Sequence, residues 1–240
     1  MKRILSLTRK CIQDYNMISQ GDKIAVGVSG GKDSMVLLRA MADLKEFYPI
    51  DYTLVAVTVD PGIPGMDFSP VKDYCDQLGI EYIRVESSLY DIIFNIRKES
   101  NPCSLCAKMR RGMLHDTAIG AGCNKIALGH HFDDAVETFM LSQVYEGRLS
   151  CFLPVTWLDR KKITMIRPLL YLRESIVSGA ARRFNMPVIE NPCPADGNTK
   201  RQEIKELLCE LNQKYPGIRE RIFGAITRLP LPGWELPDTK

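Results

Sequence analysis

The chain has 240 residues, of which 45% are hydrophobic and 25% are charged, and its formal net charge at pH 7 is +3. These values are typical of one large globular domain, or of one domain with a small appendage. No apolar run approaches the length of a membrane span, and the N-terminal residues lack a signal-peptide core. The sequence therefore predicts a cytoplasmic protein without a membrane partner. Its mildly basic charge permits nucleic-acid binding but does not by itself indicate it.

The first predicted elements lead into a glycine-rich turn. Helical spacing from Leu5 to Ile18 predicts a helix that ends near Gly21, and the apolar run Ile24 to Val28 predicts a buried parallel strand. Helical spacing resumes from Met35 to Met41. The turn between strand and helix is Ser29-Gly30-Gly31-Lys32-Asp33-Ser34.

The composition of this turn predicts a phosphate-binding site. Gly30 and Gly31 let the backbone approach an anion and turn its N–H groups inward. The helix N-terminus contributes a partial positive charge, and Lys32 contributes a full one. The hydroxyls of Ser29 and Ser34 can also contact phosphates, and Asp33 can face a magnesium ion or a polarised substrate. A turn that merely joins strand to helix is the alternative interpretation.

The spacing within the turn distinguishes between nucleotide-binding motifs. It matches neither the usual triphosphatase loop nor the Gly-x-Gly-x-x-Gly dinucleotide pattern. It resembles Ser-Gly-Gly-x-Asp-Ser, the PP-loop of the ATP pyrophosphatase superfamily. That resemblance implies cleavage of ATP to AMP and pyrophosphate, usually through adenylation of a carbonyl oxygen.

Alternating strands and helices follow the turn. The expected strands are 52–59, 81–85, 125–128 and 163–167, with a further short strand at 187–189. The expected helices are 69–78, 89–96, 107–119, one that ends at Val144, 173–184, 199–215 and 218–227. Residues 147–160 are predicted to form a loop or a short ribbon. This alternation predicts an α/β fold, a doubly wound and mostly parallel sheet with helices on both faces.

Three segments describe the expected domain organisation. Residues 1–22 form an N-terminal helix, residues 23–228 form the PP-loop domain, and residues 229–240 form an extended tail. Ligands bind outside the carboxyl ends of the strands in such sheets, so Asp60 can reach adenine or ribose. A turn-forming role before Pro61-Gly62 is the alternative for this residue.

Eight cysteines in a reducing compartment indicate metal or redox chemistry for some of them rather than a disulfide framework. Cys103 and Cys106 form a Cys-x-x-Cys pair, which fits a redox dithiol or half of a zinc site. Asn191-Pro192-Cys193 repeats the tripeptide around Cys103. Three thiolates without an evident fourth ligand suit an iron–sulfur cluster with one open iron, and zinc or no metal remain alternatives.

Taken together, the motifs resemble one family. They are the PP-loop, Cys103-Ser-Leu-Cys106 with the basic residues after it, Gly129-His-His-Phe-Asp-Asp134, Arg167-Pro-Leu169 and Cys193. In this order they resemble the tRNA 2-thiocytidine synthetase (tRNA-cytidine 2-sulfurtransferase) family. The resemblance covers roughly 23–208 and implies a [4Fe-4S] cluster held by Cys103, Cys106 and Cys193.

The resemblance also implies roles for further residues. Gly129, His130 and Asp134 are expected on the ATP side, although an acidic residue here can simply cap a helix. Arg110 is expected to stabilise oxyanion charge, with a solvated helix face as its alternative. The neighbouring Lys108 and Arg111 are expected to contact RNA phosphates.

The implied reaction uses ATP with Mg²⁺. The C2 oxygen of an anticodon-loop cytidine is adenylated, with Asp33 and Arg110 as catalytic residues, and sulfur then replaces it to give 2-thiocytidine. The expected partners are tRNA and a sulfur donor, either free sulfide or a product of cysteine desulfurase, and a homodimer is one option. The chain ends soon after Trp234, so we expect any tRNA surface that a C-terminal extension supplies in longer members to be absent or rebuilt here. Modification of another base or of a small molecule, and a non-catalytic sensor, are the alternatives.

Overall fold

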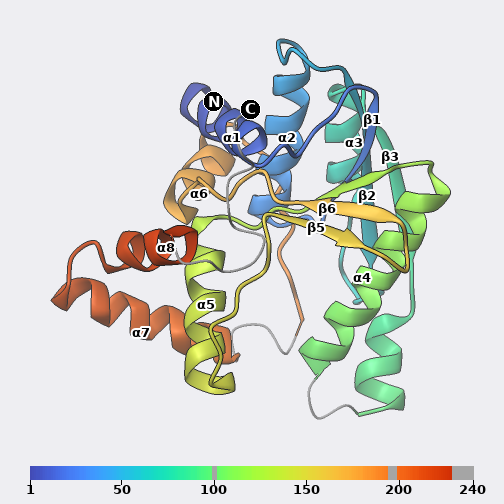
Figure 1. The fold of residues 1–240 in the computed structure, drawn as a ribbon. Coiled ribbons are helices and arrows are strands. Elements are labelled where there is room, and N and C mark those ends of the chain that lie inside the picture. The colour runs from blue at the N-terminus through green and yellow to red at the C-terminus, as the bar shows by residue number, and fades with distance from the viewer. Residues whose placement is uncertain (99–101, 194–198, 229–240) are drawn as a thin grey trace.

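The computed structural model describes residues 1–98, 102–193 and 199–228, which fold around a six-stranded sheet (Figure 1). Its strand order is β3-β2-β1-β4-β6-β5, and every neighbouring pair is parallel except β5 with β6. The strands are β1 Asp22–Gly27, β2 Tyr52–Asp60, β3 Glu81–Glu86, β4 Lys125–Ala127, β5 Val155–Leu158 and β6 Ile163–Ile166. The predicted doubly wound, mostly parallel architecture is confirmed.

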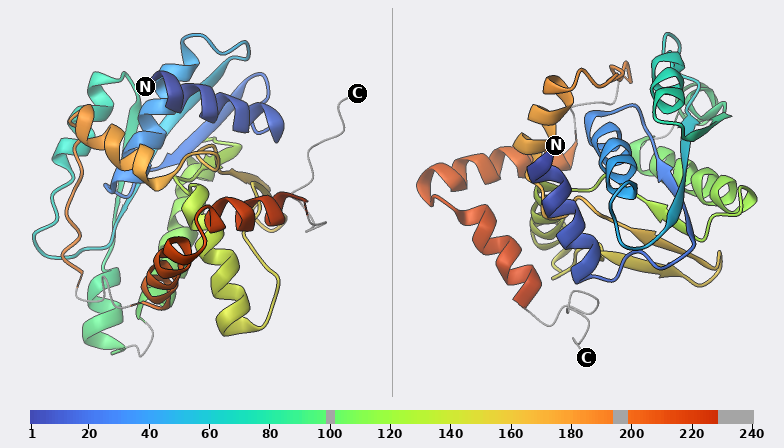
Figure 2. Two further views of the ribbon diagram at one scale, coloured as in Figure 1. Left: turned by 90° about the vertical axis from the view of Figure 1, so that its left-hand side faces the viewer. Right: turned by 90° about the horizontal axis from the view of Figure 1, so that it is seen from above.

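Helices cover both faces of the sheet (Figure 2). The helices are α1 Lys2–Asp14, α2 Lys32–Lys45, α3 Ser69–Gln77, α4 Pro102–Gly120, α5 Phe132–Glu146, α6 Glu174–Arg183, α7 Lys200–Lys214 and α8 Ile218–Arg228. The described residues also include one π-helix, η1 Asp91–Ile96, between β3 and α4. On one face α1 and α6 pack around α2, and α4 covers strands β1, β2 and β4 on the opposite face.

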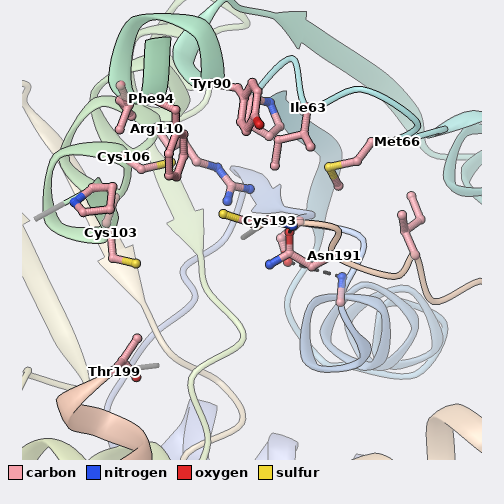
Figure 3. Close-up of a pocket in the computed structure, with 17 residues that line it drawn as sticks. Ile63, Met66, Tyr90, Phe94, Cys103, Cys106, Arg110, Asn191, Cys193 and Thr199 are labelled. Carbon is pink, nitrogen blue, oxygen red and sulfur yellow. Dashed lines mark hydrogen bonds between the residues drawn. The ribbon is translucent and has the colours of Figure 1, made fainter. Parts of the chain in front are cut away.

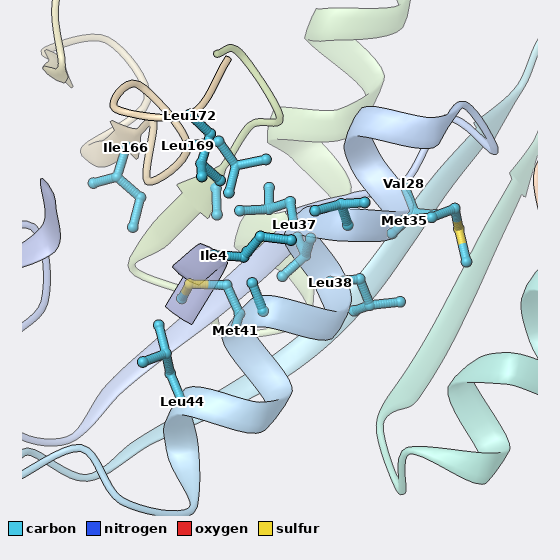
Figure 4. Packing of buried hydrophobic residues seen from close by; sticks show 14 of the residues in the cluster. Ile4, Val28, Met35, Leu37, Leu38, Met41, Leu44, Ile166, Leu169 and Leu172 are labelled. Atoms are coloured by element: carbon cyan, nitrogen blue, oxygen red, sulfur yellow. The ribbon is translucent and has the colours of Figure 1, made fainter. Parts of the chain in front are cut away.

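The main hydrophobic core lies between the sheet and α2. Eight residues of α2 are buried, because this helix faces the sheet and is itself covered by α1 and α6. Leu37, Leu38 and Met41 of α2 pack with Ile4 of α1 and Leu169 (Figure 4). The core therefore holds the N-terminus of α2, and with it the turn before that helix, in a fixed position.

Several element boundaries differ from the sequence-based predictions. The first helix ends at Asp14 rather than near Gly21, and α4 begins at Pro102, so that it contains both cysteines of the Cys-x-x-Cys pair. Residues 187–189 do not form a strand, although the Ile189 N–H donates to the Gly30 carbonyl. Conversely, residues 155–158 form the antiparallel edge strand β5. This agrees with the short ribbon that is one of the two predictions for residues 147–160.

The predicted tail 229–240 lies outside the described residues. Among the residues that are described, no helix has the length and apolar character needed to cross a membrane.

The strand order places two loops beside each other. The sheet runs in one direction from β1 to β3 and in the other from β4 to β6, so the order reverses between β1 and β4. The loops that follow these two strands diverge around a crevice at their carboxyl ends. One loop carries Ser29 to Gly31, and the other carries Leu128 to His131. The reversal therefore brings the two predicted ATP-side motifs together.

Candidate active site at the carboxyl edge of the sheet

The turn after β1 is stabilised by its own hydrogen bonds. The Ser34 hydroxyl donates to the Gly31 carbonyl over 2.8 Å, and the Ser29 N–H donates to the Ser34 oxygen over 3.2 Å. Gly30 has a φ of +84°, a value that favours glycine, and a Cβ there would lie 3.0 Å from the Ile189 side chain. Gly31 is the N-cap of α2 and no side chain caps it. The first N–H groups of α2 therefore remain available to an anion.

Gly129 is required by the close approach of the second loop. A Cβ on this glycine would lie 3.0 Å from the carbonyl carbon of Asp33 and 3.1 Å from the Ser34 nitrogen. Because these are backbone atoms, no side-chain rotation relieves the clash. The second loop thus packs directly on the phosphate-binding turn.

A cavity of about 460 Å³ opens between these loops and α4. Ser29, Asp33 and Ser34 line it together with Gly129, His130 and Asp134. Gly31 lines the neighbouring cavity described below, Lys32 lines an open depression beside α6, and Gly30 lies behind the turn against Ile189. The structure thus brings most of the predicted ATP-side residues around one space, which we call the nucleotide cavity.

Charged partners surround the Lys32 ammonium. It lies 3.2 Å from an oxygen of Asp33 and 3.2 Å from Glu174 at the start of α6. Burial acts to lower the pKa of Lys32, but the two carboxylates outweigh it and raise that pKa. For Glu174, burial acts to raise the pKa, yet the ammonium groups of Lys205 and Lys32 hold it at about 2. No sequence signal identified Glu174 or Lys205, because their helices are remote from the turn along the chain.

Asp33 has one carboxylate oxygen with no hydrogen-bond donor among the described residues. Its Oδ2 faces Lys32, whereas its Oδ1 is buried and accepts no hydrogen bond. His131 Nε2 lies 3.6 Å from this oxygen, which is too far for a hydrogen bond. An unpaired carboxylate oxygen beside a phosphate-binding turn fits a magnesium ion that a triphosphate brings with it.

His130 is neutral at physiological pH. Burial, followed by the nearby Arg167 guanidinium, lowers its pKa to about 4. Its Nδ1 accepts from Arg167 Nε over 3.3 Å, and its ring packs on Phe152. His130 can therefore offer a neutral ring to the nucleotide cavity rather than a second positive charge.

Asp134 takes part in a capping box. Its Oδ2 accepts from the His131 N–H over 2.9 Å, while the Asp134 N–H donates to His131 Nδ1 over 3.4 Å. Its other oxygen lies 3.4 Å from Arg201 of α7. The alternative role as a helix cap is thus realised, and the same residue also lines the nucleotide cavity.

Asp60 lies apart from the other predicted ATP-side residues. Its carboxylate accepts from Arg84 over 2.5 Å and from the Gly62 N–H over 2.8 Å. It lines neither the nucleotide cavity nor its neighbour. This geometry favours the turn-forming role over the predicted contact with adenine or ribose.

The three predicted cluster cysteines face a second cavity. Cys103 and Cys106 lie in the first two turns of α4, and Cys193 reaches the same space from the segment after α6 (Figure 3). This cavity has a volume of about 360 Å³ and we call it the thiol cavity. All eight cysteines belong to the described part of the chain, and none forms a disulfide. Burial raises the pKa of Cys106, which Arg110 opposes.

The arrangement of the thiols discriminates between kinds of metal site. Among residues 1–98, 102–193 and 199–228, no three His, Cys, Asp or Glu side chains are placed to hold a single metal ion. The three thiols line one cavity, and the other described residues that line it include no further Cys and no His, Asp or Glu. A group with several irons, bound by three thiolates, fits this arrangement better than one zinc ion in a closed tetrahedral site.

Arg110 connects the two cavities. It lies one turn beyond Cys106 on α4, and its guanidinium points into the space beside Cys193 (Figure 3). Ser29, Ala107 and Arg110 line both the nucleotide cavity and the thiol cavity. Arg110 is thus no solvated surface residue, and its charge lies between the two predicted ligands.

Comparison with known proteins identifies the chain as a PP-loop protein. A sequence family described as a PP-loop domain matches residues 4–211. The chain is similar to the U34-tRNA thiolase NcsA from Methanococcus maripaludis, solved with its [4Fe-4S] cluster, with a TM-score of 0.75 at 26% identity, covering 93% of this chain and 77% of that one.

Curated relatives refine the class. The tRNA-cytidine(32) 2-sulfurtransferase of Pelobacter propionicus is 41% identical over 231 residues, which are 95% of this chain and 86% of the relative. The protein of the same name from Geobacter sulfurreducens is 39% identical over 228 residues, 94% of this chain and 89% of the relative. The chain belongs to the tRNA-cytidine(32) 2-sulfurtransferase family of PP-loop proteins.

Proposed function

We propose that this protein is an ATP-dependent tRNA sulfurtransferase that converts cytidine 32 of tRNA, the nucleotide in its relatives' name, to 2-thiocytidine. One observation carries the proposal. The nucleotide cavity and the thiol cavity share Ser29, Ala107 and Arg110, so the sites for activation and for sulfur delivery are adjacent. A base between them can be activated from one side and receive sulfur from the other.

The residues of the PP-loop bind the ATP phosphates. Backbone N–H groups at the start of α2 and the hydroxyls of Ser29 and Ser34 contact the anion, Gly30 and Gly31 allow the backbone of the turn its shape, and Lys32 supplies a full positive charge. A magnesium ion that accompanies the triphosphate would be held by Asp33, whose Oδ1 accepts no hydrogen bond from the described residues. Gly129, His130 and Asp134 form the opposite wall of the nucleotide cavity. Asp60 acts indirectly, by shaping the turn after β2.

Cys103, Cys106 and Cys193 hold a [4Fe-4S] cluster. When bound, a cluster with three cysteine ligands supplies an iron with an open coordination position. The thiols must lose their protons on binding. The Arg110 guanidinium opposes the effect of burial on the Cys106 pKa and so favours its thiolate.

Adenylation solves a leaving-group problem. The C2 oxygen of the cytosine attacks the α-phosphorus of ATP, a C–O–P link forms and pyrophosphate departs. Sulfur then forms a bond to C2, and the original oxygen leaves with AMP. Asp33 positions the magnesium ion and thereby the phosphates, while Arg110 stabilises negative charge that develops near C2.

The remaining components of the reaction follow from this chemistry. The sulfur arrives at the oxidation level of sulfide, either as free sulfide or as the persulfide sulfur of a cysteine desulfurase after a thiol has reduced it by two electrons, and the reaction takes place in the cytoplasm, where thiols remain reduced. A homodimer stays a prediction, which light scattering of the purified protein would test.

Mass spectrometry of tRNA nucleosides tests the proposed function. Bulk tRNA from cells that lack the protein should contain no 2-thiocytidine, and a plasmid with the wild-type gene should restore it. Purified protein with a reconstituted cluster should catalyse tRNA-stimulated exchange between ATP and pyrophosphate. Unchanged 2-thiocytidine in the deleted strain, or exchange that ignores tRNA, would show that the substrate is a different one.

A further inference from the structure

Much of the thiol cavity is lined by apolar residues rather than by cysteines. Its wall away from Cys103 consists of Pro61, Ile63, Met66, Tyr90, Ile93 and Phe94. Tyr90, Ile63 and Met66 lie on one side of Arg110, whereas Cys103 and Thr199 lie on the other (Figure 3). The apolar part of the cavity, which we call its aromatic end, therefore lies beside Arg110; Cys106 packs against the same cluster as Phe94, whereas Cys103 lies on the far side of Arg110.

The two aromatic rings at this end pack against each other. Tyr90 and Phe94 stand four residues apart on the π-helical segment, with ring centroids 5.0 Å apart and an interplanar angle of 35°. The Tyr90 N–H donates to the Pro61 carbonyl over 2.8 Å. Leu89 and Ile93, which flank Tyr90 along this segment, are buried in a cluster with Val59. The Tyr90 ring is thus held from behind while it remains half-buried at the cavity wall.

Two polar residues also line this cavity. Arg110 reaches into the space, and Asn191 lines it from the segment that carries Cys193. Asn191 Oδ1 accepts from the Cys193 backbone N–H over 3.3 Å, so the Asn191 amide nitrogen faces away from this bond and can donate elsewhere. An apolar slot with a few oriented polar groups suits a flat heteroaromatic ligand.

We propose that the aromatic end of the thiol cavity binds the target pyrimidine after it leaves the base stack of the RNA, with Tyr90 as its stacking platform. The proposal rests on the proposed function and adds the place where the base lies. A base inside a folded RNA loop cannot present C2 to two reagents, so it must be extruded. Extruded RNA bases commonly stack on aromatic side chains. A base stacked on Tyr90 shares its cavity with Arg110, which also lines the nucleotide cavity.

An alternative role for the rings is to shield the cluster from solvent. The two roles differ in what a Tyr90 substitution affects. Loss of a shield changes the cluster's lifetime and leaves the contribution of the target base to RNA binding intact. Loss of a platform weakens RNA binding only when the base is present.

A double-mutant cycle between Tyr90 and the RNA base separates these roles. The cluster-loaded protein, with an ATP analogue that resists cleavage, is titrated with a tRNA anticodon stem-loop that has cytidine at position 32, and with the same stem-loop abasic at that position. Tyr90→Leu should weaken binding of the cytidine stem-loop roughly tenfold, because it removes one base–aromatic stack. Binding of the abasic stem-loop should change less than about twofold. Tyr90→Trp should bind the cytidine stem-loop about as tightly as the wild-type protein does, because tryptophan also stacks on a base.

Trp157→Leu is the matched control, because Trp157 is an exposed aromatic residue on edge strand β5 and lines neither cavity. It should affect both stem-loops equally. ATP binding and thermal unfolding verify that the Tyr90 variants are folded. Equal weakening of both stem-loops by Tyr90→Leu, or no weakening, overturns the stacking platform while leaving the proposed function standing. A wild-type protein that binds neither stem-loop removes the proposed function, and this inference with it.

Discussion

The nucleotide cavity and the thiol cavity are adjacent, but they are built in different ways. The phosphate-binding turn joins β1 to α2 and is closed by hydrogen bonds between Ser29, Gly31 and Ser34. The thiol cavity takes its sulfur atoms from α4 and from a segment that follows α6. The first site is thus local in sequence, whereas the second joins residues that are about 90 positions apart.

The two sites therefore differ in how much of their shape the protein itself supplies. The turn is already shaped for an anion because the core holds α2 and because Gly129 packs against it. Among the described residues, no three metal-binding side chains are placed for a single ion, so the structure shows no preformed single-ion site at the thiols. Substitutions of residues that line only one of the two cavities should therefore affect that cavity's ligand and spare the other.

Cys193→Ala should have the largest effect. It removes the only predicted cluster ligand outside α4, so we expect loss of the cluster's visible absorption and of thiolation. ATP binding should remain within about twofold, because Cys193 does not line the nucleotide cavity. Absorption spectroscopy and calorimetry with ATP measure the two effects.

Cys209→Ala is its control, since Cys209 is an exposed cysteine on α7 and lines neither cavity. This variant should keep both the spectrum and the activity. A full cluster in the Cys193→Ala protein would show that the three-cysteine assignment is wrong.

Gly129→Ala should weaken ATP binding and leave the cluster unchanged, the opposite of Cys193→Ala. Its Cβ would lie 3.0 Å from the Asp33 carbonyl carbon, and accommodating it costs about 1–3 kcal/mol of strain. The turn must shift, so ATP affinity should fall roughly tenfold while the cluster's absorption is kept. Gly179→Ala on α6 is the control, because a Cβ there meets nothing within 4 Å and helix propensity favours it. Equal ATP affinity in the two variants would contradict the tight packing of the loops.

The same difference, between a site that is local in sequence and one that joins distant residues, explains which features the sequence could predict. The turn from Ser29 to Ser34 was predictable because its residues are contiguous and each type has a distinct role at the anion. The cysteine set was predictable only as a pattern, since convergence of α4 with the segment around Cys193 is a long-range property of the fold. The strand predicted at 187–189 was wrong: a single hydrogen bond from Ile189 to Gly30 serves there in place of a ladder.

The ion pairs around Glu174 lay beyond sequence reasoning. Glu174 begins α6 and contacts Lys32 of the PP-loop and Lys205 of α7, so three separate elements meet at one carboxylate. Nothing local to Glu174 marks it, because an acidic residue in the first turn of a helix is common. Only the packing of α6 on α2 brings this residue to the phosphate-binding turn.

Glu174→Gln should have a moderate, pH-dependent effect. The folded-state pKa of Glu174 is held at about 2, below its ordinary value of 4.5, so its ion pairs stabilise the fold at pH values above 4.5 and lose that effect as the pH falls toward 2. We expect the variant to unfold with about 0.5–1 kcal/mol less free energy at pH 7, and the gap to close between pH 4.5 and 2. Urea unfolding across this range measures it. Glu46→Gln, at an exposed carboxylate, should show no such gap.

Asp60→Asn should have the smallest effect on ligand binding. The Asp60 carboxylate binds Arg84 and the Gly62 N–H and lines neither cavity, so its charge is used within the fold. Asparagine keeps an oxygen for Gly62 but loses the ion pair, so stability should fall by about 1–2 kcal/mol. ATP affinity should change less than twofold, because the turn keeps its backbone path and the nucleotide cavity keeps its wall. Calorimetry with ATP on the folded variant decides the matter: a loss of tenfold or more would return Asp60 to the adenine or ribose, and would show that the nucleotide reaches further along β2 than its cavity does in this structure.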